Sequence, residues 1–176
     1  AQGYYGVTPD LCTLSKALSN GVPLAVLAGK EKIMSKIMDP ELPVAHGGTF
    51  SGSLMGVAAA LACLDSMSAP DFYPRLFHTA ELFFTELQKL FQEEGVVAQV
   101  QHLGSSFTIY FGISTPVTDY KQFKELDHEG AKRFFRKCIE KGIYFHTDFT
   151  VSAAHTEEDI LATLDKMRKI IKEIKQ

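Results

Sequence analysis

The strongest constraint on this sequence is the order of helix and strand patterns in its second half. Segments 71–94 and 127–141 each carry an apolar stripe at helical spacing and end at a glycine, a frequent helix terminator. Between them, short apolar runs at 96–100 and 107–111 have the length of strands. Helices that alternate with pairs of short strands predict an α/β unit with a small, largely antiparallel sheet.

The end of the chain continues this pattern. Residues 143–145 and 149–152 are predicted to be short strands, and Thr156 is predicted to cap a final helix. Acidic residues fill the first turn of that helix and lysines lie toward its end, as the helix dipole favours. The side chains predicted to face inward from the helices at 71–94 and 127–141 are Leu76, Phe77, Leu82, Phe83, Phe84, Leu87, Leu90, Phe91, Phe134, Phe135, Cys138 and Ile139.

The first half of the chain is punctuated by glycines and has shorter elements. A Pro-Asp turn leads into a short strand, and the apolar run at 23–29 has the length of a second strand. A short helix is expected at 30–38, and an Ala-rich helix suited to close packing at 54–66. We therefore expect two regions, residues 1–68 with loops that could form a site, and residues 69–176 with the α/β unit.

Composition narrows the class of protein. The chain is 45% hydrophobic and 22% charged, which is typical of a globular protein, and its formal net charge is -3. Its lysines and arginines form no long run, which argues against nucleic acid or an anionic membrane as the main partner. No apolar run reaches the roughly 20 residues that span a bilayer. Cys12, Cys63 and Cys138 fit no metal or disulfide spacing, so a reducing, cytoplasmic location is expected.

Lys16, in the segment TLSKALSNG, is the first candidate for chemistry. A lysine that acts as a nucleophile must be neutral part of the time, so burial or a nearby charge must lower its pKa from about 10.4. The small neighbours Ser15 and Ala17 leave room above the amine, and a glycine turn follows. Two interpretations stay open on this segment alone, a Schiff-base lysine or an ordinary surface charge.

Segment 46–53, HGGTFSGS, is the second candidate. Its glycines permit unusual backbone shapes, its hydroxyls can donate hydrogen bonds, and an apolar helix follows. Backbone N–H groups at a helix start suit a phosphate, although the Gly-Lys-Ser/Thr of a P-loop is absent. The alternative is a flexible loop that leads into the helix.

Together these two strings resemble a known family. GVTPDLCTLSKALSNGVPLAVLAGKEKIM followed by GGTFSGSLMGVAAALACL is similar to the class III, pyridoxal-phosphate-dependent aminotransferases, and closest to their glutamate-1-semialdehyde 2,1-aminomutase branch. The string SAAHTEEDI at 152–160 is similar to the same branch. The resemblance covers nearly the whole chain.

The resemblance implies a fold, a cofactor and site residues. The chain would be the C-terminal part of a fold-type I transferase, with 1–68 from the large cofactor-binding domain and 69–176 as the small domain. Lys16 matches the catalytic lysine that binds pyridoxal 5'-phosphate as a Schiff base. Thr49, in a turn with Gly48, matches the residue that contacts the cofactor phosphate across a homodimer interface. The substrate would be a small amino compound, and the aminomutase reaction would serve tetrapyrrole precursor synthesis.

Parts of the family pattern are missing. The aspartate that pairs with the cofactor ring nitrogen, the phosphate loop and the stacking aromatic would lie before Ala1, and Asp10 is not that aspartate. We therefore expect these residues to be part of a longer enzyme and to be inactive alone. The absence of arginine in 149–159 favours the aminomutase branch or amine substrates, whereas segment 143–150 is shorter than expected for aminomutases.

Other residues and functions remain as alternatives. An aminotransferase that uses a keto acid, or an inert dimerisation module of the same fold, would share these motifs. His155 is expected to be structural, and His46 could approach the cofactor or a dimer partner. His146 and Asp148 lack a third ligand, so no metal site is expected.

Overall fold

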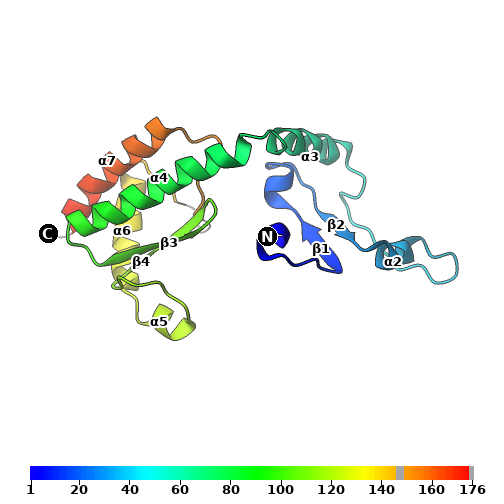
Figure 1. Ribbon diagram of the computed structural model, residues 1–176, viewed down its shortest axis with the longest axis horizontal. Helices are drawn as coiled ribbons and strands as arrows, with labels where there is room; N and C mark the ends of the chain where they lie inside the picture. Colours follow the sequence, from blue (N-terminus) through cyan, green and yellow to red (C-terminus); the bar gives the residue numbers. More distant parts are fainter. Residues whose placement is uncertain (146–148, 175–176) are drawn as a thin grey trace. The chain divides into compact units, whose positions relative to one another are not determined.

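In the computed structural model, which describes residues 1–145 and 149–174, the chain divides into two units, Ala1–Ala69 and Pro70–Gln176. Each unit has its own helices and its own two-stranded antiparallel sheet (Figure 1). No helix within the described residues is both long and apolar enough to cross a membrane.

The second unit contains the predicted helices and hairpin. β3 and β4 pair in register from Ala98 opposite Phe111 to Leu103 opposite Ser106, and Gly104 turns the chain with φ 59°. The elements of this unit are α4 (Phe72–Glu93), β3 (Ala98–Leu103), β4 (Ser106–Phe111), α5 (Tyr120–Lys124), α6 (His128–Glu140) and α7 (Glu157–Ile174).

The core of the second unit lies between one face of the hairpin and the helices. Alternate residues of β3 and β4 are buried, as expected when one face of a sheet packs on helices. α4 packs against α7 and β3, and α6 packs against α7 and β4 (Figure 1). The fully buried side chains include Leu87, Phe91, Phe134, Cys138, Met167, Ile170 and Ile171.

Two side chains expected in this core are exposed. Phe77 lies near the start of α4, where its ring is tilted against that of Tyr73 and lies next to Gly104 instead of entering the core. Ile139 is 55% exposed, because α6 presents Phe134 and Cys138 inward and the residue after Cys138 is turned about 100° away. The prediction was wrong for both residues.

The strands expected after α6 are reduced to a single bridge. Residues 143–145 form no strand, and beyond the gap in the described residues Thr150 makes an isolated bridge to Ser106. Backbone bonds on either side, from the Phe107 N–H to the Phe149 carbonyl (3.0 Å) and from the Val151 N–H to the Ser105 carbonyl (2.9 Å), hold this segment beside β4. The sheet is therefore smaller than predicted.

Helix caps explain where several helices of this unit begin. The Asp127 carboxylate accepts from the Gly130 N–H at 2.7 Å, and Asp119 caps α5, a short helix that the sequence did not predict. Thr156 and Asp159 cap α7 reciprocally, as described below. Asp71 precedes α4 without a side-chain cap bond, although aspartate at this position predicts one.

The first unit is built around a short hairpin. β1 pairs with β2, Leu11 lying opposite Gly29, and an ion pair between Asp10 and Lys30 closes the open end. The helix expected at 30–38 is divided into an α-helical and a 3₁₀ turn. The elements are α1 (Gln2–Tyr5), β1 (Leu11–Leu14), η1 (Lys16–Leu18), β2 (Val26–Gly29), α2 (Glu31–Met34), η2 (Ser35–Met38) and α3 (Leu54–Met67).

The first unit leaves most of its apolar surface uncovered. Among its residues, all of which are described, only Ser19, Gly56 and Ala60 are buried. α3 is apolar on nearly all sides, yet Leu54 is 85% and Met55 73% exposed. A helix of this composition is typical of one surrounded by protein, so the unit presents a surface suited to contact with further polypeptide.

Candidate cofactor site

Lys16 stands at the end of β1, where the chain turns into η1. Its side chain is exposed, and its φ of 53° places the backbone in the left-handed region that lysine rarely adopts. The preceding Ser15 is fully extended, with φ -163° and ψ -161°. The strand ends at Leu14, and Lys16 begins η1 two residues later, so Lys16 lies just beyond the sheet.

Serine hydroxyls hold the segment that follows Lys16. Ser15 Oγ donates to the Leu24 carbonyl at 2.9 Å, which closes the base of the loop. Ser19 Oγ donates to the Val22 carbonyl at 2.7 Å, and the Ser19 N–H donates to the Lys16 carbonyl at 3.2 Å. Lys16 thus lies in a loop with one hydrogen bond across its base and further hydrogen bonds between its own residues.

A hollow of about 420 Å³ borders Lys16. It is lined by two neighbouring segments of the same loop, from Ser15 to Ala17 and from Asn20 to Leu24. The lining combines the small residues Ser15, Ala17 and Gly21 with larger ones such as Asn20 and Leu24. No carboxylate belongs to this wall.

The Gly48–Thr49 turn leads into α3. The Ser51 N–H donates to the Gly48 carbonyl at 2.9 Å, and the Ser53 N–H donates to the Phe50 carbonyl at 3.1 Å. Thr49 is exposed, and its hydroxyl has no hydrogen-bond partner within the part of the chain that the structure describes. Ser53, considered as a phosphate ligand from the sequence, is instead the helix cap, because its hydroxyl accepts from the Gly56 N–H at 3.3 Å.

The helix after this turn packs on the Lys16 loop. Gly56, in the first turn of α3, is buried, and a Cβ at this position would lie 3.0 Å from the Pro23 carbonyl oxygen. α3 also contacts η1, which begins at Lys16. The two sequence strings are therefore joined through Gly56 and Pro23, while Lys16 and Thr49 share no hydrogen bond.

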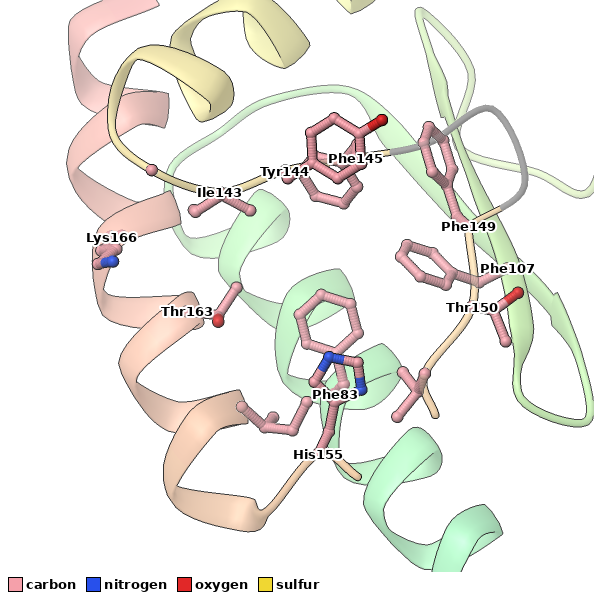
Figure 2. A pocket seen from close by; sticks show the side chains of 13 residues that line it. Phe83, Phe107, Ile143, Tyr144, Phe145, Phe149, Thr150, His155, Thr163 and Lys166 are labelled. Carbon is pink, nitrogen blue, oxygen red and sulfur yellow. The ribbon is translucent and has the colours of Figure 1, made fainter. Parts of the chain in front are cut away.

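A second hollow, also of about 420 Å³, lies within the second unit (Figure 2). Phe107 and Phe149 line one side, and Thr163 and Lys166 of α7 lie on the other (Figure 2). His146 and Asp148, weighed above as metal ligands, lie outside the described residues. In the described part of the chain, no cluster of three or more His, Cys, Asp or Glu is placed to hold a metal ion.

His155 borders this second hollow and has a structural bond. Its Nδ1 accepts the Ser152 N–H at 2.9 Å, so the neutral ring carries its hydrogen on Nε2. This bond holds the turn that leads into α7. His46 is exposed at the entrance to the Gly-rich turn, with no hydrogen-bond partner in the described residues.

Ser19 is a buried residue of the Lys16 loop that the sequence did not single out. It is only 1% exposed, although serine is mostly exposed in folded proteins. Its burial depends on how the loop folds back on itself, which no local pattern shows. The nearest signal is the Ser-Asn-Gly turn itself, which requires left-handed backbone at Asn20 and Gly21.

Comparison with known proteins identifies the family. The family model for class III aminotransferases matches residues 1–171. The chain is 35% identical over 178 residues to glutamate-1-semialdehyde 2,1-aminomutase from Desulfatibacillum aliphaticivorans, covering 99% of this chain and 41% of that protein. The chain thus spans less than half the length of this relative.

Solved structures agree in fold. An omega-transaminase from Sphaerobacter thermophilus superposes with a TM-score of 0.85 at 22% identity, over 99% of this chain and 41% of that one. A glutamate-1-semialdehyde-aminomutase from Pseudomonas aeruginosa PAO1 gives 0.81 at 19% identity, over 98% and 41%. These likenesses confirm the predicted α/β fold of a fold-type I transferase. Because the family model matches nearly the whole length of this chain, the chain belongs to the class III aminotransferases, a family of pyridoxal-phosphate-dependent enzymes.

Proposed function

We propose that this chain carries the catalytic lysine of an enzyme that transfers amino groups with pyridoxal phosphate. Lys16 would bind the cofactor covalently through Nζ. The observation that carries this proposal is its position, an exposed amine in left-handed backbone at a strand end, beside a hollow of about 420 Å³. In this proposal the hollow would admit the planar aldehyde of the cofactor next to Lys16.

Lys16 would have a second task during the reaction. When bound, pyridoxal phosphate supplies the electron sink for the chemistry. Once displaced by the substrate amine, the Lys16 Nζ would hold a proton and move it between the substrate carbon and the cofactor, as a general acid and base. The bonds across its loop would keep this amine in place.

Thr49 and Gly48 are proposed to bind the cofactor phosphate of a second subunit. The exposed Thr49 hydroxyl is free to donate, and Phe50, Leu54 and Met55, which follow it in the chain, are large, apolar and exposed. Exposed apolar side chains around a polar group suit a subunit interface. We propose a homodimer in which each Thr49 serves the neighbouring site.

The two units correspond in this proposal to parts of the whole enzyme. Unit Ala1–Ala69 would be the end of the large cofactor-binding domain, and Pro70–Gln176 the small domain. The uncovered apolar surface of the first unit supports the view that further protein completes it. The remaining cofactor contacts, including an acidic partner for the ring nitrogen, would come from that further protein.

The reaction proposed first is that of a glutamate-1-semialdehyde 2,1-aminomutase. The 35% identity to such an enzyme supports this choice. An aminotransferase that passes the amino group to a keto acid fits the same residues, and an inert module of the same fold is the third possibility. The reactions differ in their substrates, because an aminomutase needs one substrate and an aminotransferase needs two.

The test uses the full-length protein with limiting pyridoxal phosphate. Borohydride reduction followed by peptide mapping should place the cofactor on Lys16. Lys16→Ala should abolish this labelling, whereas Lys32→Ala, which removes another exposed lysine of the same unit, should not. Labelling spread over surface lysines, or absent from Lys16, would contradict the proposal. Turnover of glutamate 1-semialdehyde without a keto acid would then separate aminomutase from aminotransferase.

A further inference from the structure

Ser19 stands out in the first unit because it is polar and buried. Among the described residues, the buried polar or charged side chains are Ser19 and Thr79, and Ser19 is 1% exposed. It lies three residues after Lys16, whose side chain is exposed. Its buried hydroxyl needs a hydrogen-bond partner, because burying an unbonded polar group is unfavourable.

The bonds of Ser19 join it to residues on both sides. Its hydroxyl donates to the Val22 carbonyl at 2.7 Å, and the Val22 N–H donates back to the Ser19 carbonyl at 3.2 Å. The Ser19 N–H donates to the Lys16 carbonyl at 3.2 Å. Ser19 therefore fixes the backbone three residues before it and three residues after it.

The backbone that Ser19 holds is strained. Lys16 has φ 53° and Asn20 has φ 45°, while Gly21 takes φ 97° without cost. Left-handed backbone at a lysine persists only when its surroundings enforce it. The loop is enforced at its base by the bond from Ser15 to Leu24 and inside by Ser19.

We infer that Ser19 is a positioning residue for Lys16, an inference that rests on the proposed function of Lys16. Ser19 touches no reacting atom in this role. Its hydroxyl holds the Val22 carbonyl and its N–H holds the Lys16 carbonyl, so that the direction in which Lys16 leaves β1 is fixed. The amine then stands beside the hollow before any ligand binds, which reduces the ordering needed for reaction.

The experiment measures two properties of the full-length protein in Ser19→Ala and Ser19→Thr. The first is the rate at which Lys16 captures pyridoxal phosphate, trapped with borohydride and read by peptide mapping. The second is amide hydrogen exchange over residues 16–22, measured without cofactor. Ser66→Ala is the matched control, because Ser66 Oγ also donates to a backbone carbonyl, that of Ala62 at 3.0 Å, within the same unit.

Ser19→Ala should slow capture at Lys16 by on the order of tenfold or more, as expected for a displaced reactive group. Ser19→Ala should also raise the rate of hydrogen exchange over residues 16–22. Ser19→Thr should restore both the capture rate and the slow exchange, and Ser66→Ala should change neither. The double variant Ser19→Ala with Lys16→Gly should regain much of the protection of residues 16–22 against hydrogen exchange, because glycine adopts positive φ without strain.

Three results would overturn the inference. The first is a rate of cofactor capture by Ser19→Ala that lies within twofold of the rate of the original protein. The second is a rate for Ser19→Thr that is as slow as that for Ser19→Ala. The third is an equal rise in exchange with and without Lys16→Gly, since a purely structural hydroxyl would not depend on residue 16. If the unaltered protein never captures the cofactor at Lys16, the proposed function fails, and hydrogen exchange still decides whether Ser19 holds the lysine backbone.

Discussion

Gly56 of α3 rests on the carbonyl of Pro23, with 3.0 Å between that oxygen and the position a Cβ would take. This contact joins the helix that follows the Gly48–Thr49 turn to the loop that carries Lys16. At this distance little room remains for a side chain at position 56. The contact is also hard to relieve, because backbone atoms move less easily than the end of a side chain.

Gly56→Val should therefore separate α3 from the Lys16 loop. Overpacking of this kind typically destabilises a protein by about 1–3 kcal/mol. Urea unfolding measures the loss, and capture of pyridoxal phosphate at Lys16 should slow in parallel. Gly47→Val is the control, since an added Cβ there meets nothing within 4 Å. Equal unfolding curves for the two variants would show that the contact does not constrain the loop.

The left-handed backbone of Lys16 gives a second prediction, on stability alone. Lys16→Gly should be more stable than Lys16→Ala by about 1 kcal/mol, because only glycine tolerates positive φ without steric cost. Both variants lack the amine, so the comparison is independent of the cofactor. Urea unfolding of the two proteins provides the measurement. A more stable Lys16→Ala would mean that the loop relaxes to an ordinary conformation.

Long periodic patterns predicted most of the second unit. α4, α6 and α7 bury a continuous stripe, and such stripes are visible in the sequence because each turn repeats them. Short apolar runs are ambiguous, which explains the error at 143–145. A run of that length is apolar whether it pairs as a strand or merely packs in extended form, and pairing depends on a distant partner.

The candidate site was predictable only in part. Lys16 and Thr49 stood out through the strings around them, and glycine signalled the turns. The burial of Ser19 could not be read in the same way, because it results from bonds across the loop to Val22 and Lys16. The contact between Gly56 and Pro23 was likewise hidden, since the two residues are far apart in sequence and only the fold brings them together.

The shared-site proposal predicts complementation between two defective variants. Lys16→Ala and Thr49→Ala should each bind or use pyridoxal phosphate poorly as pure homodimers. In a mixed dimer, one site would combine the intact Lys16 of one subunit with the intact Thr49 of the other. Mixing after mild dissociation should therefore restore activity to part of the population. If no activity returns in verified mixed dimers, Thr49 does not serve the neighbouring site.

The buried thiol of Cys138 predicts a graded reactivity among the cysteines. Cys138 is fully buried, and burial raises the pKa of its thiol to about 12. Because the thiolate is the reactive form, Cys138 should not react with Ellman's reagent at pH 8 in the folded protein. Cys12 and Cys63 are partly exposed and should react first. In denaturant all three should react alike, and early modification of Cys138 would contradict the packing of α6.

The start of α7 gives a prediction on acid stability. The Thr156 N–H donates to the Asp159 carboxylate at 2.9 Å, as does the Thr156 hydroxyl at 2.9 Å, and the Asp159 N–H donates to the Thr156 hydroxyl at 3.2 Å. This reciprocal arrangement is a capping box. The Thr156 backbone N–H, followed by the Thr156 hydroxyl, lowers the pKa of Asp159 below its ordinary value of 3.8.

The sign of the pH effect follows from that lowered pKa. A carboxylate with a depressed pKa in the folded state stabilises the protein fully above the unfolded value of 3.8, and this contribution is lost as the pH falls through the folded pKa. Asp159→Asn should therefore destabilise the protein at pH 6 and approach the stability of the original protein near pH 2. Urea unfolding at the two pH values provides the test.

A matched control separates the cap from the helix dipole. Glu158→Gln removes a charge from the same first turn, and in the described residues the Glu158 side chain makes no hydrogen bond. Its effect should be smaller than that of Asp159→Asn at pH 6. Thr156→Ala should cost about 1 kcal/mol, the usual loss for a helix cap. If Asp159→Asn and Glu158→Gln lose equal stability, the dipole accounts for the effect and the reciprocal bonds of Thr156 and Asp159 add nothing measurable.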